Sequence, residues 1–269
     1  DGATLSTTRY GEGMPLPAGT PLLIELTIGG QRFQLLNGGP MYRPTPSISF
    51  FVQLASAEAA QPVYDALSAG GKVMMPLGAW PWSPCYAWVE DRFGVSWQLI
   101  VGEGDIGPAA IVPCFMFAGA QHGRAAEAMA LWTGLFPGAE VGPVEQYAEG
   151  EGPAGTIKHG RFRLGGQGFV AMDAHGEHGF TFTEGVSLAV RCADQAAVDH
   201  YWDGLTADGG EPGRCGWLTD RFGVSWQIVP EKLLALQARG DAARTGRMFQ
   251  ALMGMGRLDA AELERAWEG

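Results

Sequence analysis

The chain of 269 residues has few cysteines and few basic residues. Its four cysteines, Cys85, Cys114, Cys192 and Cys215, lie far apart and form no CxxC pair. This excludes a disulfide scaffold, and we expect buried free thiols in a cytoplasmic protein. The 18 Lys and Arg residues are scattered among 29 Asp and Glu residues, for a net charge of −11. Because nucleic-acid binding needs a basic face and anionic membranes repel such a chain, we expect neither partner.

Long apolar runs are also missing. No stretch reaches the ~20 consecutive apolar residues of a membrane-spanning helix, and the first residues lack the basic-then-apolar order of a signal peptide. What the chain has in excess is glycine, 41 residues, together with nine Trp and a hydrophobic share of 46%. This composition argues against disorder and predicts packed cores with many tight turns between short strands.

The sequence contains two copies of one unit. Asp91–Gln98 and Asp220–Gln227 both read DRFGVSWQ. Other landmarks recur in the same order, among them PAGT, GGQxF and the pair YDALSAGG and WDGLTADGG. The period is far above the 20–50 residues of a solenoid. We therefore predict two domains at residues 1–105 and 106–230, followed by a helical extension at 231–269.

The second copy predicts an α+β fold of two successive β-α-β-β-β modules. Apolar runs and polar–apolar alternation predict strands, and apolar residues at helical spacing predict helices. Asp194 suits an N-cap. The predicted strands are 111–117, 158–164, 168–173, 186–191, 215–218 and 224–229, and the predicted helices are 124–136 and a segment that Gly209-Gly210 ends.

The first copy has the same second half, with a helix near Ala57–Leu67, but a shorter front. It has 16 residues before Pro17, whereas 42 residues run from Ile111 to the matching Pro153. A strand and helix of about 26 residues are therefore missing. Either this sequence starts inside the domain, or the first sheet takes a replacement strand from elsewhere, such as a partner chain.

The last 39 residues are rich in Ala, Leu, Arg and Glu and predict helices at 231–239, 242–253 and 260–267. Asp241 and Asp259 are suitable N-caps. This tail has no counterpart in the first copy, where a short linker, 102–107, leads into the second domain. We interpret the tail as a packing brace across the domains or a dimer contact, with an independent binding helix as the alternative.

Paired β-α-β-β-β units, each closed by a DRFGxSWQ strand, resemble the vicinal oxygen chelate superfamily of glyoxalases, extradiol dioxygenases and bleomycin-resistance proteins. Within it, the chain resembles the PhnB-like family, whose usual label is 3-demethylubiquinone-9 3-methyltransferase. The resemblance covers nearly the whole chain and rests on the motifs that follow: YGEG (10–13), PAGT, GGQxF (29–33), LNGGP (36–40) and the AW/GWxxDRFGVSWQ strands.

The resemblance implies tandem vicinal-oxygen-chelate domains in which strands curl around a cleft. In metal-dependent relatives the cleft holds a divalent ion on His, Gln and Glu. Here the closing-strand Glu position falls at Gln98 and Gln227, and the first-strand His position falls at Pro113. All five histidines lie at residue 122 or later. The standard metal site is therefore broken in both copies, and we expect no cofactor, with a divalent metal as the alternative.

One cluster contains suitable metal donors in six residues: Asp173, His175, Glu177 and His178. The alternative interpretation is a solvated polar turn after a strand. The repeated DRFG is interpreted as an Asp-initiated turn in which Gly94 and Gly223 take a positive φ.

Strand alternation gives a second set of candidate residues. Trp97 and Leu99 should face the helices, whereas Ser96 and Gln98 should face the cleft. By the repeat, the polar cleft lining would comprise Ser96, Gln98, Ser225, Gln227, Asn37 and Asp173. These side chains either bind a small ligand or satisfy hydrogen bonds in a filled barrel.

Two functions remain open. The first is a metal-independent protein that binds a small molecule in the cleft, and the second is a glyoxalase- or dioxygenase-type enzyme with atypical metal ligands. The methyltransferase activity of the family label is disfavoured because no strand leads through a G-x-G-x-x-G turn into a helix. A copy serving only as an interface, and a homodimer of the whole chain, are further interpretations.

Overall fold

The computed structural model describes residues 2–11, 16–102, 111–176 and 178–269. Strands and helices are mixed along the chain, and the predicted α+β class is confirmed. The chain divides into two compact units, Asp1–Thr181 and Phe182–Gly269. The linker predicted at 102–107 and the Glu-Gly part of YGEG lie largely outside the described residues.

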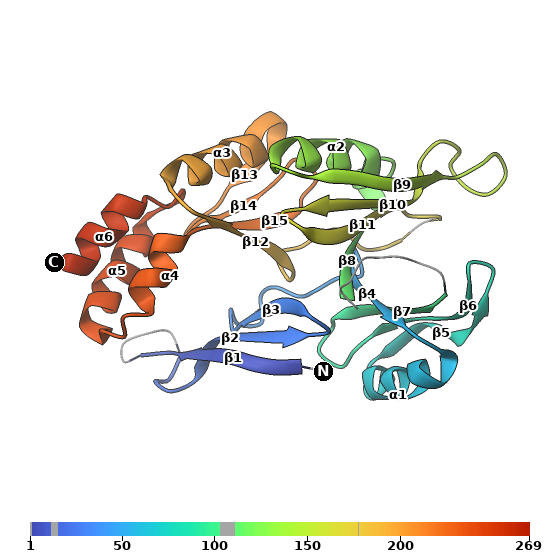
Figure 1. Ribbon diagram of the computed structural model, residues 1–269, viewed down its shortest axis with the longest axis horizontal. Helices are drawn as coiled ribbons and strands as arrows, with labels where there is room; N and C mark the ends of the chain where they lie inside the picture. Colours follow the sequence, from blue (N-terminus) through green and yellow to red (C-terminus); the bar gives the residue numbers. More distant parts are fainter. Residues whose placement is uncertain (1, 12–15, 103–110, 177) are drawn as a thin grey trace. The chain divides into compact units, whose positions relative to one another are not determined.

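An eight-stranded sheet dominates the first unit (Figure 1). Its strand order is β5-β6-β7-β4-β8-β11-β10-β9. Helix α1 packs against β4–β7 and helix α2 against β8–β11. The bounds are β4 Ile48–Leu54, α1 Ala57–Ser68, β5 Lys72–Trp80, β6 Ser83–Glu90, β7 Ser96–Val101, β8 Ile111–Phe117, α2 Ala125–Leu135, β9 Glu140–Gln146, β10 Ile157–Leu164 and β11 Gln167–Asp173.

The sheet consists of two β-α-β-β-β modules joined side by side. In each module the last strand pairs parallel with the first, as β7 does with β4 and β11 with β8. An antiparallel seam between β4 and β8 joins the modules, with Phe51 opposite Val112. The sheet thus combines the second half of the first sequence copy with the first half of the second copy.

The sheet curls strongly. The rings of Phe51 on β4 and His159 on β10 lie 6.2 Å apart between centroids, although two strands separate β4 from β10 in the sheet. With neighbouring strands ~4.8 Å apart, a flat sheet would place these strands about 14 Å apart. The side that carries Phe51 and His159 is therefore concave, and we call it the inner face. The opposite face packs against α1 and α2.

A three-stranded antiparallel sheet, β1-β2-β3, completes the first unit. Its strands are β1 Gly2–Arg9, β2 Pro21–Ile28 and β3 Gln31–Leu36. The ring of Phe33 packs edge-on against Phe50 with a centroid distance of 5.2 Å. About half of the surface of Leu5, Leu35 and Leu36 is exposed. These three strands correspond to the last three strands of a module, as the shortened first copy predicts.

The second unit holds the fourth module and the helical tail. Its sheet has the order β12-β15-β14-β13, again with the last strand parallel to the first. The predicted tail helices and their N-caps are present, because Asp241 and Asp259 accept backbone N–H groups of α5 and α6. The bounds are β12 Ser187–Cys192, α3 Gln195–Thr206, β13 Glu211–Pro212, β14 Trp217–Thr219, β15 Ser225–Pro230, α4 Glu231–Gln237, α5 Ala242–Gly254 and α6 Ala260–Glu268.

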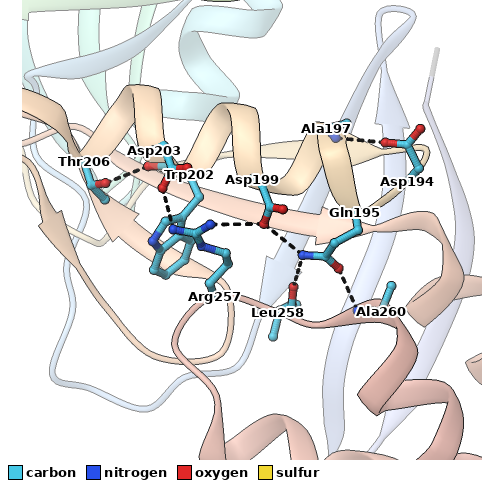
Figure 2. A network of polar contacts seen from close by, with 10 residues as sticks. All are labelled: Asp194, Gln195, Ala197, Asp199, Trp202, Asp203, Thr206, Arg257, Leu258 and Ala260. Carbon is cyan, nitrogen blue, oxygen red and sulfur yellow. Dashed lines mark hydrogen bonds and ion pairs between the residues drawn. The ribbon is translucent and has the colours of Figure 1, made fainter.

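The tail is bound to its own unit by polar contacts with α3 (Figure 2). The side chain of Gln195 accepts a hydrogen bond from the Ala260 amide at 2.9 Å and donates one to the Leu258 carbonyl at 3.1 Å. Arg257 pairs with Asp199 and Asp203 on α3. The tail therefore acts as a brace within residues 182–269. Its predicted roles across the domains and in a dimer stay predictions.

The repeated DRFG segments form turns built around their aspartates. The Asp91 carboxylate accepts the backbone N–H groups of Phe93 and Val95 and the indole N–H of Trp97. Asp220 makes the equivalent three contacts in its copy. Gly94 and Gly223 have φ values of 86° and 85°, which disfavour any side chain. The predicted structural role of this motif is confirmed.

The compact units and the sequence repeat divide the chain differently. The predicted boundaries, 1–105, 106–230 and 231–269, follow the repeat and stay a prediction about the repeated units. The eight-stranded sheet crosses the first boundary because β4 and β8 share hydrogen bonds. The tail is included in the second unit.

Candidate functional site

Gln98 lies at the centre of a buried hydrogen-bond network on the inner face. Its Nε2 donates to the Ser49 hydroxyl at 2.8 Å, and its Oε1 accepts from the Tyr86 hydroxyl at 2.6 Å. Only 2% of the Gln98 surface is exposed. On the same face, the indole N–H of Trp88 donates to the Ser96 hydroxyl at 2.8 Å. The two predicted cleft residues of this strand thus face the cleft but bond to neighbouring side chains.

The thiol of Cys114 on β8 extends this network. Burial raises its pKa to about 12, against which contacts with Ser49 and Gln98 act in the opposite direction. Burial also raises the pKa of the Tyr86 phenol, and the neighbouring Cys114 adds to the effect. Both groups are therefore neutral at pH 7, so this part of the inner face carries no charge.

The other half of the inner face differs because β10 carries a basic column. Strand alternation places His159, Arg161 and Arg163 on one face of β10, opposite to Phe162 and Leu164, which are buried towards α2. Arg161 lies across from Val170 of β11, and Arg163 lies between Gly168 of β11 and Glu140 of β9. The column therefore faces the cleft.

His159 is neutral at physiological pH. Its pKa is lowered to about 4, chiefly by burial and also by the positive charge of Arg161, whereas Glu145 acts in the opposite direction. The imidazole can therefore accept or donate a hydrogen bond but carries no charge.

A solvent-open hollow of about 210 Å³ lies beside this column. Its walls include Arg161, Arg163, Val112, Glu140, Gly142 and Gly168. The two glycines flank the arginines on the neighbouring strands. A Cβ at Gly142 would lie 3.4 Å from the Arg161 Cβ. This volume is smaller than the ~300–1,000 Å³ of typical small-molecule sites.

Aromatic and methionine side chains line the half of the inner face formed by β5–β7. The rings of Trp80 and Trp82 stack with centroids 5.6 Å apart, and Trp82 meets Tyr86 edge-on at 5.5 Å. Phe180 packs edge-on against Trp88 at 6.4 Å. Met74, Met75, Met116 and Met172 lie in or beside the same apolar cluster. Polarisable, flexible methionines suit ligands of varied shape.

The three described members of the predicted donor cluster, Asp173, His175 and His178, do not converge. Asp173 lies on the outer face, where its two carboxylate oxygens accept the backbone N–H groups of Ala125 and Ile157. The ring of His175 contacts Tyr147, whereas that of His178 contacts Phe180 and Trp88. Glu177 lies outside the described residues. The Asp173 carboxylate therefore binds the first backbone N–H groups of α2 and β10, and it does not lie on the inner face.

The remaining predicted residues lie on other sheets. Asn37 is exposed at the end of β3, and its side-chain amide donates to the Pro21 carbonyl at 3.1 Å. In the second unit, Gln227 donates to Ser187 at 2.8 Å, which repeats the pairing of Gln98 with Ser49. The buried Ser225 hydroxyl has no hydrogen-bond partner among the described residues. Within the first unit, Asn37 and Asp173 therefore do not join Ser96 and Gln98 on the inner face.

The inner face does not fit the divalent metal that the superfamily implies. Cys114 is held neutral by burial, and Ser49, Gln98 and Tyr86 also offer neutral oxygens that are bonded to one another. Alternation places Pro113, the expected histidine position, on the opposite face beside Phe50. Among the residues that the structure describes, no group of three His, Cys, Asp or Glu side chains is placed to hold a metal ion.

The sequence analysis did not predict several residues of the inner face. Ser49, Tyr86 and Cys114 carry no sequence signal, because only sheet pairing brings them to Gln98. The basic column did carry one, since His159, Arg161 and Arg163 alternate with small and apolar residues in KHGRFRL. That alternation indicates a strand with a basic face but does not say which face is concave.

The sequence model of one protein family, 3-demethylubiquinone-9 3-methyltransferase, matches residues 1–100 and 109–229. The chain belongs to this family. The two matched segments correspond to the two sequence copies. The PhnB protein of Bacillus cereus is 35% identical, covers 44% of this chain and 95% of its own, and has a TM-score of 0.40. No curated protein matches the chain.

Glyoxalase I of Zea mays shares the fold. Its V278E mutant is 12% identical, covers 85% of this chain and 83% of its own, and has a TM-score of 0.54. This likeness and the two family segments agree with the predicted tandem vicinal-oxygen-chelate fold. None of the helices among the described residues combines the length and the apolar character needed to span a membrane.

Proposed function

We propose that the inner face of the eight-stranded sheet binds an apolar, aromatic small molecule without the help of a divalent metal. The carrying observation is the aromatic and apolar cluster of the inner face, which shares Val112 with the solvent-open hollow. Such a lining with few convergent polar groups is typical of small-molecule sites.

The chemistry of the donors supports the metal-free part of this proposal. Gln98 is hydrogen-bonded to Ser49 and Tyr86, so the side-chain oxygens of these three residues already contact neighbouring side chains. A divalent cation prefers carboxylate, imidazole or thiolate ligands. The burial that keeps Cys114 protonated opposes such binding. We assign no methyl transfer, because the part of the chain that the structure describes holds no Gly-rich turn between a parallel strand and a helix for a nucleotide-like cofactor.

The binding site is tested with N-phenyl-1-naphthylamine, a neutral dye that fluoresces in apolar surroundings. Gly168→Val places a branched side chain at the wall of the hollow. We expect steric exclusion to lower the dye affinity at least tenfold, which is the size of effect that a few methyl groups have in an apolar pocket. Val144→Leu on β9 lies outside the hollow and serves as the matched control. Unchanged dye affinity in folded Gly168→Val protein would overturn the proposed site.

Elemental analysis of the purified protein tests whether it holds a metal ion. Mass spectrometry of extracted ligands tests which small molecule it binds. We expect a substoichiometric metal content and dye binding that added Mn²⁺, Ni²⁺ or Zn²⁺ leaves unchanged. One tightly held divalent ion per chain would overturn the metal-free proposal and favour the glyoxalase- or dioxygenase-type alternative.

A further inference from the structure

The hairpin β2–β3 has the same geometry as the hairpin β10–β11. The turns of both hairpins begin with the sequence GGQ. Ile24 lies opposite Leu35 as Gly160 lies opposite Ala171, so both strands are related by an offset of 136 residues. Each residue of β2–β3 can therefore be compared with the residue in the same position of β10–β11.

One face of β2–β3 is apolar but lacks the helix that covers its counterpart. This face, which we call the open face, carries Ile24, Leu26, Ile28, Phe33 and Leu35. In the counterpart, α2 packs against β10 and β11, and Leu164 and Ala171 are 4% and 0% exposed. Ile28 and Leu35, in the same positions, are 38% and 54% exposed. Neither α1 nor α2 makes a comparable contact with β1, β2 or β3.

Asn37 at the end of β3 is a second feature of a helix-binding site. It corresponds to Asp173, which accepts the Ala125 N–H at the start of α2 through one oxygen and the Ile157 N–H through the other. The Asn37 side chain repeats the second contact, since its Nδ2 donates to the Pro21 carbonyl. Among the described residues, no group donates to the Asn37 Oδ1. This oxygen corresponds to the one that begins α2.

The outer edge of β3 is a third feature. In the counterpart, β11 pairs antiparallel with β10 on one edge and parallel with β8 on the other. Within the described part of the chain, β3 pairs with β2 alone. The other edge of β3 can therefore accept a parallel strand through main-chain hydrogen bonds. A strand on this edge and a helix on the open face are the two parts of a segment such as β8–α2.

We propose that the β1-β2-β3 sheet binds a strand-and-helix segment of a different polypeptide, as β10 and β11 bind α2 and β8. The strand lies parallel to β3, the Asn37 Oδ1 accepts an N–H group of the first helical turn, and the apolar side of the helix covers the open face. The open face continues an interface within the unit, because the Phe33 ring packs against Phe50. The inference concerns another sheet than the proposed function and does not depend on it.

A second copy of this chain does not have such a segment to give. Its strand-and-helix segments β4–α1, β8–α2 and β12–α3 each pack within their own module. The open face also restricts the helix that it accepts. A Cβ at Gly160 would lie 2.9 Å from the Met129 Sδ of α2, and Ile24 takes the position of Gly160. The bound helix therefore has a small residue opposite Ile24, because a methionine would be overpacked.

The test uses a synthetic, fluorescently labelled peptide of residues 111–136 that carries Met129→Ala, and measures its binding to the protein by fluorescence anisotropy. We expect this peptide to bind about tenfold more tightly than the unmodified peptide, which places Met129 against Ile24. If neither peptide binds, or if the unmodified peptide binds better, the proposal is overturned.

Two protein variants locate the binding surface. Leu35→Glu places a charge on the open face and should weaken peptide binding at least tenfold, because the bound helix would bury that charge. Leu36→Glu is the matched control, since Leu36 is 47% exposed on the other face of the same strand. Circular dichroism checks that both variants fold. Equal losses in the two variants would contradict binding at the open face.

Asn37→Ala should weaken the peptide about fivefold, as the loss of a helix cap does, and an unchanged affinity would contradict the assigned contact. Light scattering tests the other occupant. A dimer that Leu35→Glu separates into monomers would show that a second copy covers the open face, and the proposal would be wrong. Gly168→Val should leave peptide binding unchanged, so this inference and the proposed function can fail separately.

Discussion

At the scale of single residues, Gln98 occupies a position at which a metal-dependent relative would need a charged ligand. Its amide instead satisfies the Ser49 and Tyr86 hydroxyls at once, and all three groups are withdrawn from water. A neutral network of this kind contributes to stability mainly because each partner would be costly to leave unpaired.

Gln98→Leu is therefore expected to lower the free energy of unfolding by about 2–3 kcal/mol, because it leaves two buried hydroxyls without partners. Gln227→Leu, in the half-buried equivalent position, should cost about 1 kcal/mol, since only the Ser187 contact is lost. Urea denaturation followed by fluorescence measures both. Equal losses in the two variants would contradict the role assigned to burial.

His159 makes stability depend on pH. Its pKa falls from 6.5 in the unfolded chain to about 4 in the folded protein, chiefly through burial. The unfolded state therefore binds more protons between these values, and stability is complete above pH 6.5 and declines towards pH 4.

We expect the decline to be on the order of 2–3 kcal/mol. His159→Gln should flatten it over this pH window, as measured by urea denaturation at several pH values. His200→Gln, at an exposed position of α3, is the control and should keep the wild-type pH dependence. A wild-type slope in His159→Gln would show that other groups cause it.

At the scale of elements, the contact between α3 and the tail depends on one amide side chain. Gln195 holds the start of α6 through the Ala260 N–H and holds the preceding turn through the Leu258 carbonyl. The neighbouring Arg257–Asp203 pair is largely exposed, and exposed ion pairs contribute little.

Gln195→Ala should lower the free energy of unfolding by about 1–2 kcal/mol, because two backbone groups lose their partner. It should also speed hydrogen exchange at the Ala260 amide. Asp203→Asn should cost only about 0.5 kcal/mol and leave that amide protected. If both variants expose Ala260 equally, the ion pair and not Gln195 fixes the tail.

At the scale of the whole molecule, the tail completes the second unit. Leu236, Met248, Leu258 and Leu263 are fully or almost fully buried in one apolar cluster. The backbone N–H groups of Cys215 and Gly216 donate to the carbonyls of Met255 and Gly256 at 2.8 Å. The fourth module therefore depends on the tail for part of its core and for two backbone hydrogen bonds.

A chain ending at Pro230 is expected to lose the folded state of residues 182–230, because that apolar surface and those N–H groups become exposed. Limited proteolysis should cut this region within minutes while residues 111–176 stay resistant. A chain ending at Trp267 keeps the cluster and is the control. Equal resistance of both truncated chains would mean that the fourth module folds without the tail.

Local features of the sequence were enough to predict most elements and turns. Asp194, Asp241 and Asp259 cap the predicted helices, and DRFG forms the predicted turns, because these signals act over a few residues. Strand β9 was not located, since Gly142 and Pro143 interrupt its pattern and an edge strand tolerates both. Alternation places Ser96 and Gln98 on one face of β7, where Ser96 contacts Trp88 and Gln98 contacts Ser49 and Tyr86.

The sequence by itself determined the repeated module, most of the secondary structure and the family, because repeats, helix caps and strand alternation depend on residues that are close together in the chain. Only the tertiary structure decided which modules share a sheet and which residues meet there. Sheet pairing places β4 next to β8 and brings Ser49, Gln98 and Cys114 together. Asp173 lies on the opposite face of the sheet. These contacts depend on strand order and on curvature, which arise from long-range hydrogen bonding and packing between segments far apart in the chain.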